Sequence, residues 1–246
     1  MTLHGRLNIE SDWDEKTLVR YNGRMVYRNR TEAGRRLGGA LAAYADRADV
    51  LVLALPRGGV PVGFEVAAAL NAPLDVFVVR KLGVPSQEEL ALGAIATGGV
   101  LVLNEDLVLH LNIPSHVIED IAARERSELE RREQAYRDGR QPPETRGRTV
   151  ILVDDGLATG ATMRAAVTAL RQSQPKRIIV AVPVAAPESC QELRREADEV
   201  ICAITPESFH GVGEWYEDFS QTSDEEVRAL LAQASRSHLN PPPFVA

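Results

Sequence analysis

Two adjacent carboxylates and a run of small residues follow one apolar segment of the chain. The segment TVILVD (149–154) ends in Asp154, and Asp155 and the run GLATGAT come next. Gly156 and Gly160 allow the backbone to approach an anion closely, and the free N–H groups of a helix beginning here would favour a phosphate. The carboxylates would repel that phosphate, so they suit hydroxyls or a cation beside it. A ligand with a phosphate, a vicinal diol and a metal ion satisfies all of these groups.

Other phosphate- and metal-binding motifs do not match this segment. A Walker A loop requires Gly-Lys-Ser/Thr, whereas Gly160 is followed by Ala161 and Thr162. The dinucleotide pattern Gly-x-Gly-x-x-Gly is absent at this strand, and a calcium loop requires alternating acids over a longer span. A glycine-rich turn without a ligand is also disfavoured, because two carboxylates at a buried strand end would be costly without a purpose.

Three cations follow two other apolar segments. VLVLAL (50–55) leads into the loop PRGG, and LDVFVVRK (74–81) ends in two basic residues. Ligands of open parallel sheets bind beyond the carboxyl ends of the strands. We therefore expect Arg57, Arg80 and Lys81 to face one phosphate loop rather than only solvent.

Strands alternate with helices of about ten residues over much of the chain. The predicted strands are the apolar runs 50–55, 74–81, 149–154, 177–184 and 199–204. A short continuous apolar run is typical of a strand buried on both faces. The alternation predicts an α/β fold, a doubly wound and mostly parallel sheet with right-handed crossovers.

Two segments interrupt this alternation. AIATGGVLVLN (94–104) is predicted to form a hairpin with Gly98-Gly99 at a two-residue turn. Residues 114–139 are predicted to form a long charged helix with a thin apolar stripe, which would pack on the body of the protein or on a partner subunit. We favour the body.

Composition limits the class of protein. The chain has 246 residues and a net charge of −7, which argues against a general nucleic-acid binder. It lacks a signal-peptide pattern and any apolar stretch of about 20 residues, so we expect no membrane span and a cytoplasmic location. Cys190 and Cys202 lack a metal-ligand spacing and are interpreted as buried free thiols.

The segment Val150 to Met163 resembles the 5-phosphoribosyl-1-pyrophosphate motif of type I phosphoribosyltransferases, with its apolar strand, two acids and a loop ending in Thr-Gly-x-Thr. The resemblance implies that Asp154 and Asp155 hold the ribose 3- and 2-hydroxyls, respectively. It also implies that the 5-phosphate lies in the loop of Gly156, Leu157, Ala158, Thr159, Gly160, Ala161 and Thr162.

The likeness covers about residues 50–205, with a departure at 104–146, where a helix is inserted. In the family, the loop after the first core strand binds pyrophosphate through a short basic-glycine element with a strained peptide. Arg57, Gly58 and Gly59 are similar in place and kind.

The second core strand of the family often ends in Arg-Lys before a mobile loop that closes over the site. Arg80 and Lys81 match this pattern, and Glu88 or Glu89 lies in the corresponding loop. The resemblance implies that Lys81 contacts the pyrophosphate and that Arg80 also binds substrate.

The reaction implied by the resemblance is displacement of pyrophosphate from ribose C1 by a ring nitrogen. The protein would position the substrate, help to neutralise the leaving group and exclude water. Lys81, Asp154 and Asp155 would be the catalytic residues. Mg²⁺ would be held mostly by substrate oxygens, with Asp154 or Asp155 as the candidate protein ligand.

The acceptor base is not identified. Enzymes for 6-oxopurines usually have an aspartate where this chain has Ala158, so it is more similar here to the adenine and orotate branches. The implied domains are a polar arm (1–23), the core (24–205) and a hood with a terminal helix and tail (206–246). Phe209, Trp215 and Tyr216 of the hood would either stack on the base or form the core of the hood.

Two other functions remain open at this stage. One is a regulatory protein that senses 5-phosphoribosyl-1-pyrophosphate without turnover, and the other is a related scaffold that hydrolyses or transfers phosphate on a different metabolite. The Arg57 loop, Lys81 and the acid pair favour the enzyme. The resemblance also suggests a homodimer, since many relatives dimerise.

Overall fold

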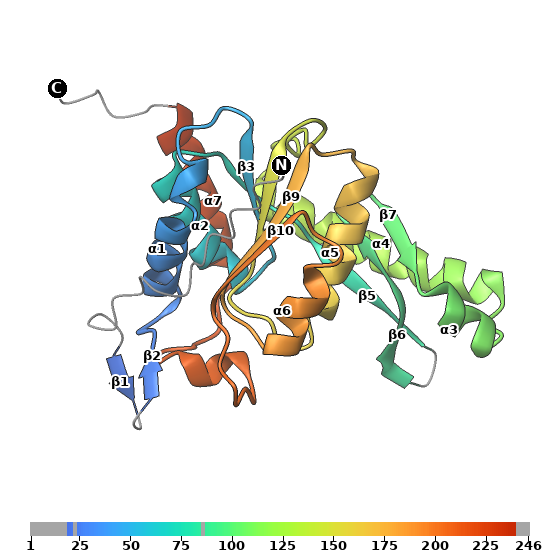
Figure 1. Cartoon of the computed structure of the whole chain (residues 1–246). Coiled ribbons are helices and arrows are strands. Elements are labelled where there is room, and N and C mark those ends of the chain that lie inside the picture. Colours follow the sequence, from blue (N-terminus) through green and yellow to red (C-terminus); the bar gives the residue numbers. More distant parts are fainter. Residues whose placement is uncertain (1–18, 22–23, 85–86, 240–246) are drawn as a thin grey trace, which may run out of the picture.

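A five-stranded parallel sheet lies at the centre of the protein (Figure 1). The computed structural model describes residues 19–21, 24–84 and 87–239. The strand order is β10-β9-β8-β3-β4. Their bounds are β3 Val50–Ala54, β4 Leu74–Val76, β8 Thr149–Val153, β9 Arg177–Val184 and β10 Glu199–Ile204.

Helices cover both faces of this sheet, as Figure 1 shows. The side chains of β3 alternate between two cores: Val50, Val52 and Ala54 pack in one, and Leu51 and Leu53 in the other. The first core includes side chains of α1 Arg30–Ala40, α2 Gly59–Leu70 and α7 Asp224–Leu239. The second includes those of α5 Ala161–Gln172 and α6 Pro187–Leu193. The predicted doubly wound α/β fold is thus confirmed.

A separate antiparallel sheet has the order β5-β6-β7. Its strands are β5 Val79–Val84, β6 Gln87–Ala96 and β7 Val100–Leu103. The prediction of a single strand at 74–81 is therefore wrong: the chain leaves the parallel sheet after Val76 and enters this sheet at Val79. The predicted hairpin is present, but three residues rather than two separate its paired ends, since Ala96 pairs with Val100.

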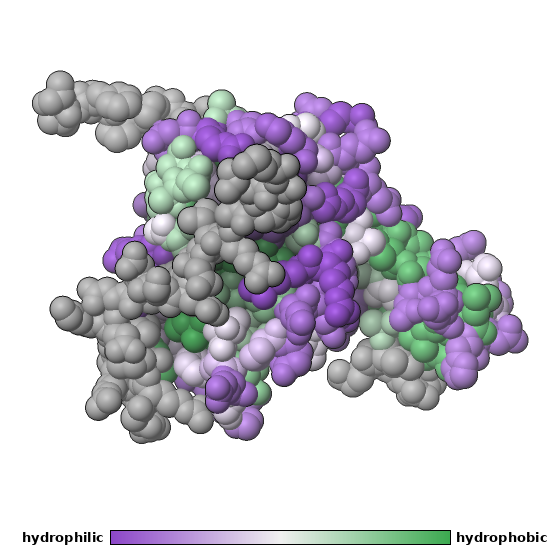
Figure 2. Space-filling view, in the orientation of Figure 1, coloured by the Kyte–Doolittle hydropathy of each residue, from purple (hydrophilic) through white to green (hydrophobic). Residues whose placement is uncertain are grey.

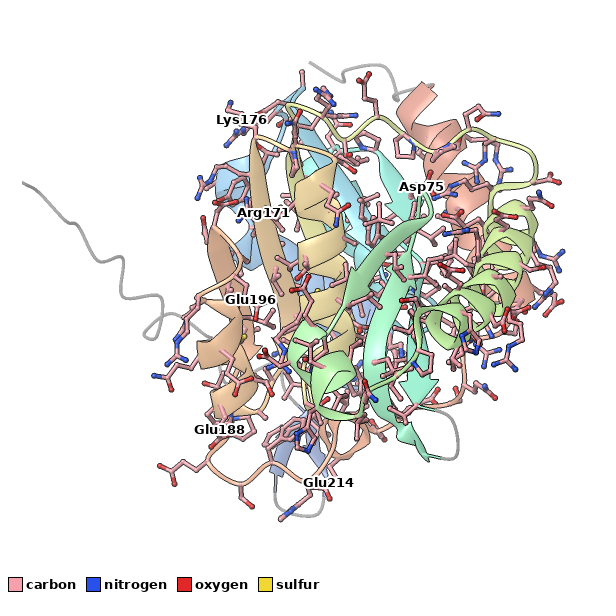
Figure 3. All side chains as sticks on the ribbon, turned by 90° about the vertical axis from the view of Figure 1, so that its right-hand side faces the viewer. Asp75, Arg171, Lys176, Glu188, Glu196 and Glu214 are labelled. Atoms are coloured by element: carbon pink, nitrogen blue, oxygen red, sulfur yellow. A yellow bond between two sulfur atoms is a disulfide. The ribbon has the colours of Figure 1, made fainter. Side chains whose placement is uncertain are left out.

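The inserted segment forms α3 Glu105–His110 and α4 Ser115–Arg137. The buried guanidinium of Arg137 binds Asp75 at 3.0 Å and the carbonyl oxygen of Val76 at 3.0 Å, which holds α4 on the edge strand β4 (Figure 3). Ile121 and Leu129 of its apolar stripe are buried, so α4 packs on the body as expected. Figure 2 shows apolar surface over the lobe of α3, α4 and β5–β7.

A small subdomain adjoins the carboxyl ends of the strands. It contains the hairpin of β1 Val19–Tyr21 and β2 Arg24–Val26 and the short 3₁₀ helix η4 Val212–Trp215. Tyr27 forms a β-bridge with Tyr216 and thereby joins the two parts. Residues 1–18 and 22–23 of the predicted polar arm lie outside the described residues. In Figure 3, Glu214 of η4 and Lys176, which precedes β9, lie at opposite ends of the protein.

Cys190 on α6 and Cys202 on β10 form a disulfide, with their Cα atoms 6.6 Å apart. The interpretation of both as free thiols was wrong. The twelve-residue spacing does not reveal that α6 packs against β10 with the two side chains facing each other. Among the described residues, no helix is both long enough and apolar enough to cross a membrane.

Candidate functional site

The site lies where the strand order reverses. β3 and β8 are neighbours in the sheet, and their successors lie on opposite sides of them, β4 beyond β3 and β9 beyond β8. Ligands of doubly wound sheets bind at such a point, beyond the carboxyl ends of the strands. The N–H of Leu55 donates to the carbonyl oxygen of Val153 at 2.8 Å, so the loops that follow the two strands start side by side.

The loop after β3 requires glycine because it packs directly against the acid pair. A Cβ atom on Gly58 would lie 2.0 Å from Oδ2 of Asp155, and one on Gly59 would lie 2.8 Å from the carbonyl oxygen of Val153. The peptide between Pro56 and Arg57 is cis. The predicted pyrophosphate loop and the predicted diol-binding acids are therefore in contact, although about a hundred residues separate them in the chain.

The two acids are held by several hydrogen bonds. Oδ1 of Asp154 accepts a 2.8 Å bond from the N–H of Asp155. Oδ2 of Asp155 accepts a 2.8 Å bond from Nε of Arg30, and the carbonyl oxygen of Asp155 accepts a 2.6 Å bond from the hydroxyl of Tyr216. Both acids remain partly exposed.

Burial raises the pKa of Asp154 well above its usual range, and the charge of Asp155 raises it further. Burial also raises the pKa of Asp155, whereas the hydrogen bond and the charge of Arg30 oppose that shift. A cation or hydroxyl groups placed against this pair would favour its ionised form.

The loop after β8 forms a cradle at the N-terminus of α5. Gly160, the N-cap residue, has φ 68°, a left-handed conformation that favours glycine. Ala158, Thr159, Ala161 and Thr162 are exposed beside it. The first N–H groups of a helix lack intrahelical partners and attract anions. The predicted phosphate loop therefore has the geometry of an anion site.

One residue of this loop is structural. The side chain of Leu157 is 3% exposed and belongs to the core. Its N–H donates to the carbonyl oxygen of Val184, and its own carbonyl oxygen accepts from the N–H of Ala186. We expect Leu157 to shape the cradle rather than to bind the phosphate itself. Gly156 contacts the hood, because a Cβ atom there would lie 2.5 Å from a methyl group of Val212.

Lys81 and the first turn of α5 line a common hollow of about 410 Å³ between the antiparallel sheet and α5. Lys81 is exposed and enters it from β5, while Ala161 and Thr162 enter it from the first turn of α5. Lys81 and the last two residues of the predicted phosphate loop therefore line the same hollow, and the contact of Lys81 with pyrophosphate stays a prediction.

The other two predicted cations make different contacts. Arg80 binds Glu125 on α4, with Nη2 and Oε2 2.7 Å apart. Arg57 lies 3.8 Å from Asp224 in the first turn of α7. A pyrophosphate contact by either side chain would compete with these ion pairs. The side chains of Glu88 and Glu89 lie outside what the structure describes.

The three candidate base-pocket residues pack in the hood. Trp215 is 9% and Tyr216 4% exposed, and both belong to a small core that Phe209 also contacts. Burial raises the pKa of Tyr216 well above its ordinary value, and the charge of Asp155 adds to this. The neighbouring ring of Phe219 is 36% exposed.

Arg30 is a site residue that sequence reasoning missed. It is the first residue of α1, and its side chain reaches both Asp155 and the hood. No motif marks it, and Arg30 lies 125 positions before Asp155 in the chain. A cation in the first turn of a helix, where the dipole disfavours it, was the one available signal.

No group of three or more His, Cys, Asp or Glu side chains that could hold a metal ion occurs in the described ranges. The carboxylate pair nevertheless offers hard oxygen ligands of the kind that Mg²⁺ prefers. An ion bound mainly by the oxygens of a ligand would fit beside it.

Comparison with known proteins agrees with this geometry. The family model described as the phosphoribosyl transferase domain matches residues 27–219. Proteins of two Mycobacterium tuberculosis strains, described as candidate phosphoribosyl transferases, are 46% identical over 211 residues, or 86% of this chain and 47% of theirs. The chain thus spans about half the length of these curated relatives. The crystal structure of TT1426 from Thermus thermophilus is 44% identical with a TM-score of 0.76, covering 85% of this chain and 99% of that one.

Proposed function

The chain belongs to the phosphoribosyl transferase domain family, and on that premise we propose that it transfers the phosphoribosyl group of 5-phosphoribosyl-1-pyrophosphate to a nitrogenous base. A ring nitrogen of the base forms a bond to ribose C1, the bond from C1 to the pyrophosphate oxygen breaks, and the ring nitrogen loses its proton. The observation that carries this proposal is the contact between the Gly58 loop and Asp155 beside the N-terminus of α5.

The three parts of the ligand correspond to three parts of the site. The 5-phosphate would lie in the cradle of Gly156–Thr162, where helix N–H groups and hydroxyls are available. The diol would bind Asp154 and Asp155, and the pyrophosphate would lie along Arg57, Gly58 and Gly59 with Lys81 as a further point charge. Such positioning and charge neutralisation are the main tasks of a protein in this type of displacement.

A magnesium ion would supply positive charge for the leaving pyrophosphate. Asp154 or Asp155 would provide the protein oxygen nearest to it, and this fits the raised pKa values of both acids, because a bound cation favours their ionised form. The acceptor base would enter from the hood. There the half-exposed Phe219 ring stacks on the guanidinium of Arg30, which in turn binds Asp155.

Calorimetric titration with 5-phosphoribosyl-1-pyrophosphate and Mg²⁺ tests the site. We expect binding by the native chain and a loss of at least tenfold in affinity for the double variant Asp154→Asn and Asp155→Asn, since each acid contributes charge-assisted hydrogen bonds. Asp198→Asn is the matched control. Asp198 immediately precedes β10, at the end of the sheet opposite the candidate site, and forms an ion pair with Arg171. Unchanged binding by the double variant would contradict the proposal.

A screen of nitrogenous bases for pyrophosphate release then tests the reaction. Release that depends on one base would identify the acceptor. Tight binding of the sugar pyrophosphate with no release for any base would instead indicate a ligand-sensing role, and the proposed transfer would be wrong.

A further inference from the structure

The guanidinium of Arg30 contacts three parts of the candidate site at once. Nε donates to Asp155 Oδ2 at 2.8 Å, and Nη1 donates to the carbonyl oxygen of Ser220 in the hood at 2.7 Å. A Cβ atom on Gly58 would lie 3.2 Å from Nε, so the pyrophosphate loop is adjacent as well. The side chains of the ion pair are only 12% and 15% exposed.

Two aromatic rings hold the guanidinium from the hood side. Its central carbon lies 4.0 Å from the centroid of the Phe219 ring and 6.0 Å from that of Tyr216. Contacts at this distance between a guanidinium and a ring are attractive, more so where water is excluded. The planar group is thus fixed in position and orientation by a carboxylate, a carbonyl and a ring.

Helix formation alone does not account for this residue. Arg30 begins α1, and the positive end of the helix dipole disfavours a cation there. The cap itself is provided by Asn29, whose side chain accepts from the N–H of Glu32. Removing Arg30 would leave the carboxylate of Asp155 without the one side-chain donor that it has among the described residues, and that carboxylate could rotate toward solvent.

We propose that Arg30 is a positioning residue that orients the Asp155 carboxylate toward the 2-hydroxyl of the bound ribose and couples it to the hood. The inference rests on the proposed function, because it assumes that the acid pair binds the sugar diol. One oxygen of Asp155 is taken by Arg30, which leaves the other to accept from the sugar hydroxyl. If the hood moved over an acceptor, Ser220 and Phe219 would move with it. Because both contact Arg30, this movement would shift the guanidinium and with it the carboxylate of Asp155.

The test compares two ligands that differ by one hydroxyl, ribose 5-phosphate and 2-deoxyribose 5-phosphate. The native chain is expected to bind the ribose form about tenfold more tightly, because a site built for a hydroxyl is left unpaired by the deoxy form. In Arg30→Gln we expect this ratio to fall below about threefold. A residue needed only for folding would weaken both ligands equally and leave the ratio unchanged.

Two further variants keep the test decisive. Arg35→Gln changes a neighbouring arginine of α1 that pairs with Glu65, and it is expected to keep the native ratio. Arg30→Lys retains the charge and replaces the glutamine variant if that one fails to fold; its ratio must also lie below the native value. Circular dichroism and thermal unfolding establish that each variant is folded.

The outcomes separate the inference from the proposed function. If the native chain discriminates between the ligands and both Arg30 variants do so equally well, the role of Arg30 is wrong and the sugar site stands. If the native chain binds neither 5-phosphoribosyl-1-pyrophosphate nor ribose 5-phosphate, the proposed function fails and the inference fails with it.

Discussion

The hydroxyl of Tyr216 donates a 2.6 Å hydrogen bond to the main-chain carbonyl oxygen of Asp155. This bond joins the hood to the strand end that carries the acid pair, and it is made by a side chain that is only 4% exposed. The hood is therefore fastened to the candidate site through the main chain of Asp155 as well as through its carboxylate.

Tyr216→Phe removes this bond and leaves a poorly hydrated carbonyl oxygen. We expect a loss of about 1 kcal/mol in the free energy of unfolding, measured by urea denaturation, and a several-fold weaker affinity for ribose 5-phosphate. Tyr44→Phe is the control: its hydroxyl binds Glu199, the first residue of β10 at the opposite end of the sheet, at 2.5 Å. An equal loss of affinity in both variants would contradict a local effect.

Gly58→Ala tests the contact between the two loops. The added Cβ atom would lie 2.0 Å from Asp155 Oδ2, so the carboxylate or the loop must move. We expect at least a tenfold loss of affinity for 5-phosphoribosyl-1-pyrophosphate in a calorimetric titration. Gly39→Ala on α1 has open space around it and is expected to stabilise the helix by about 0.5–1 kcal/mol without a change in affinity.

Asp154→Asn tests the electrostatics of the acid pair through stability. The pKa of Asp154 is higher in the folded protein than in the unfolded chain. The folded state therefore loses stability as the pH rises above the ordinary pKa of an aspartate, because the buried carboxyl group must then ionise. We expect the variant to unfold at a higher temperature than the native chain at about pH 7, and the difference to vanish below about pH 3, where the aspartate holds its proton in both the folded and the unfolded state.

Asp155→Asn should behave differently in the same experiment. It would leave the nearly buried Arg30 without its charged partner. We expect a smaller gain in unfolding temperature than that of Asp154→Asn at about pH 7, because burial raises the pKa of Asp155 as well but the hydrogen bond and the charge of Arg30 oppose that shift. A gain for Asp155→Asn that equals or exceeds that of Asp154→Asn, or a pH-independent effect of Asp154→Asn, would contradict the assigned charges.

The sequence was sufficient for those elements that depend on local patterns. The apolar runs at 149–154, 177–184 and 199–204 became β8, β9 and β10 with bounds that agree to within one residue. β8 and β9 are buried on both faces of the parallel sheet, and this burial is what makes a strand continuously apolar, whereas β10 at the edge of the sheet is mostly half-buried. The acid pair and the cradle followed because they are contiguous in the chain.

The remaining features depend on contacts between distant residues. The run 74–81 is apolar through Phe77 and Val78, which are both buried, so hydropathy does not show that the chain changes sheets there. The pairing of Arg80 with Glu125 arises from the packing of an inserted helix. Likewise, the spacing of Cys190 and Cys202 says nothing about the orientation of α6 on β10.

The disulfide leads to a stability prediction. Linking residues 12 positions apart restricts the unfolded chain, and replacing both cysteines by serine should cost about 2–3 kcal/mol. We expect a reducing agent to lower the unfolding temperature of the native chain and to leave that of the double serine variant unchanged. The same unfolding temperature for the native chain before and after verified reduction would show that the bond does not contribute to stability.

Lys81→Gln distinguishes the pyrophosphate from the rest of the ligand. Lys81 and Thr162 line the same hollow, whereas Arg80 is engaged with Glu125. A lysine that contacts pyrophosphate should matter for 5-phosphoribosyl-1-pyrophosphate and much less for ribose 5-phosphate. We expect about a tenfold loss of affinity for the former, measured by calorimetry.

Two controls locate this effect on the molecule. Lys176→Gln removes an exposed lysine that pairs with Asp49 at the end of the protein opposite the hood (Figure 3), and it should leave both affinities unchanged. Arg80→Gln should affect the pyrophosphate ligand less than Lys81→Gln does, because Arg80 must first leave Glu125 to reach it. A larger effect at Arg80 would mean that the ion pair with α4 opens when the ligand binds and that Arg80, rather than Lys81, provides the main positive charge.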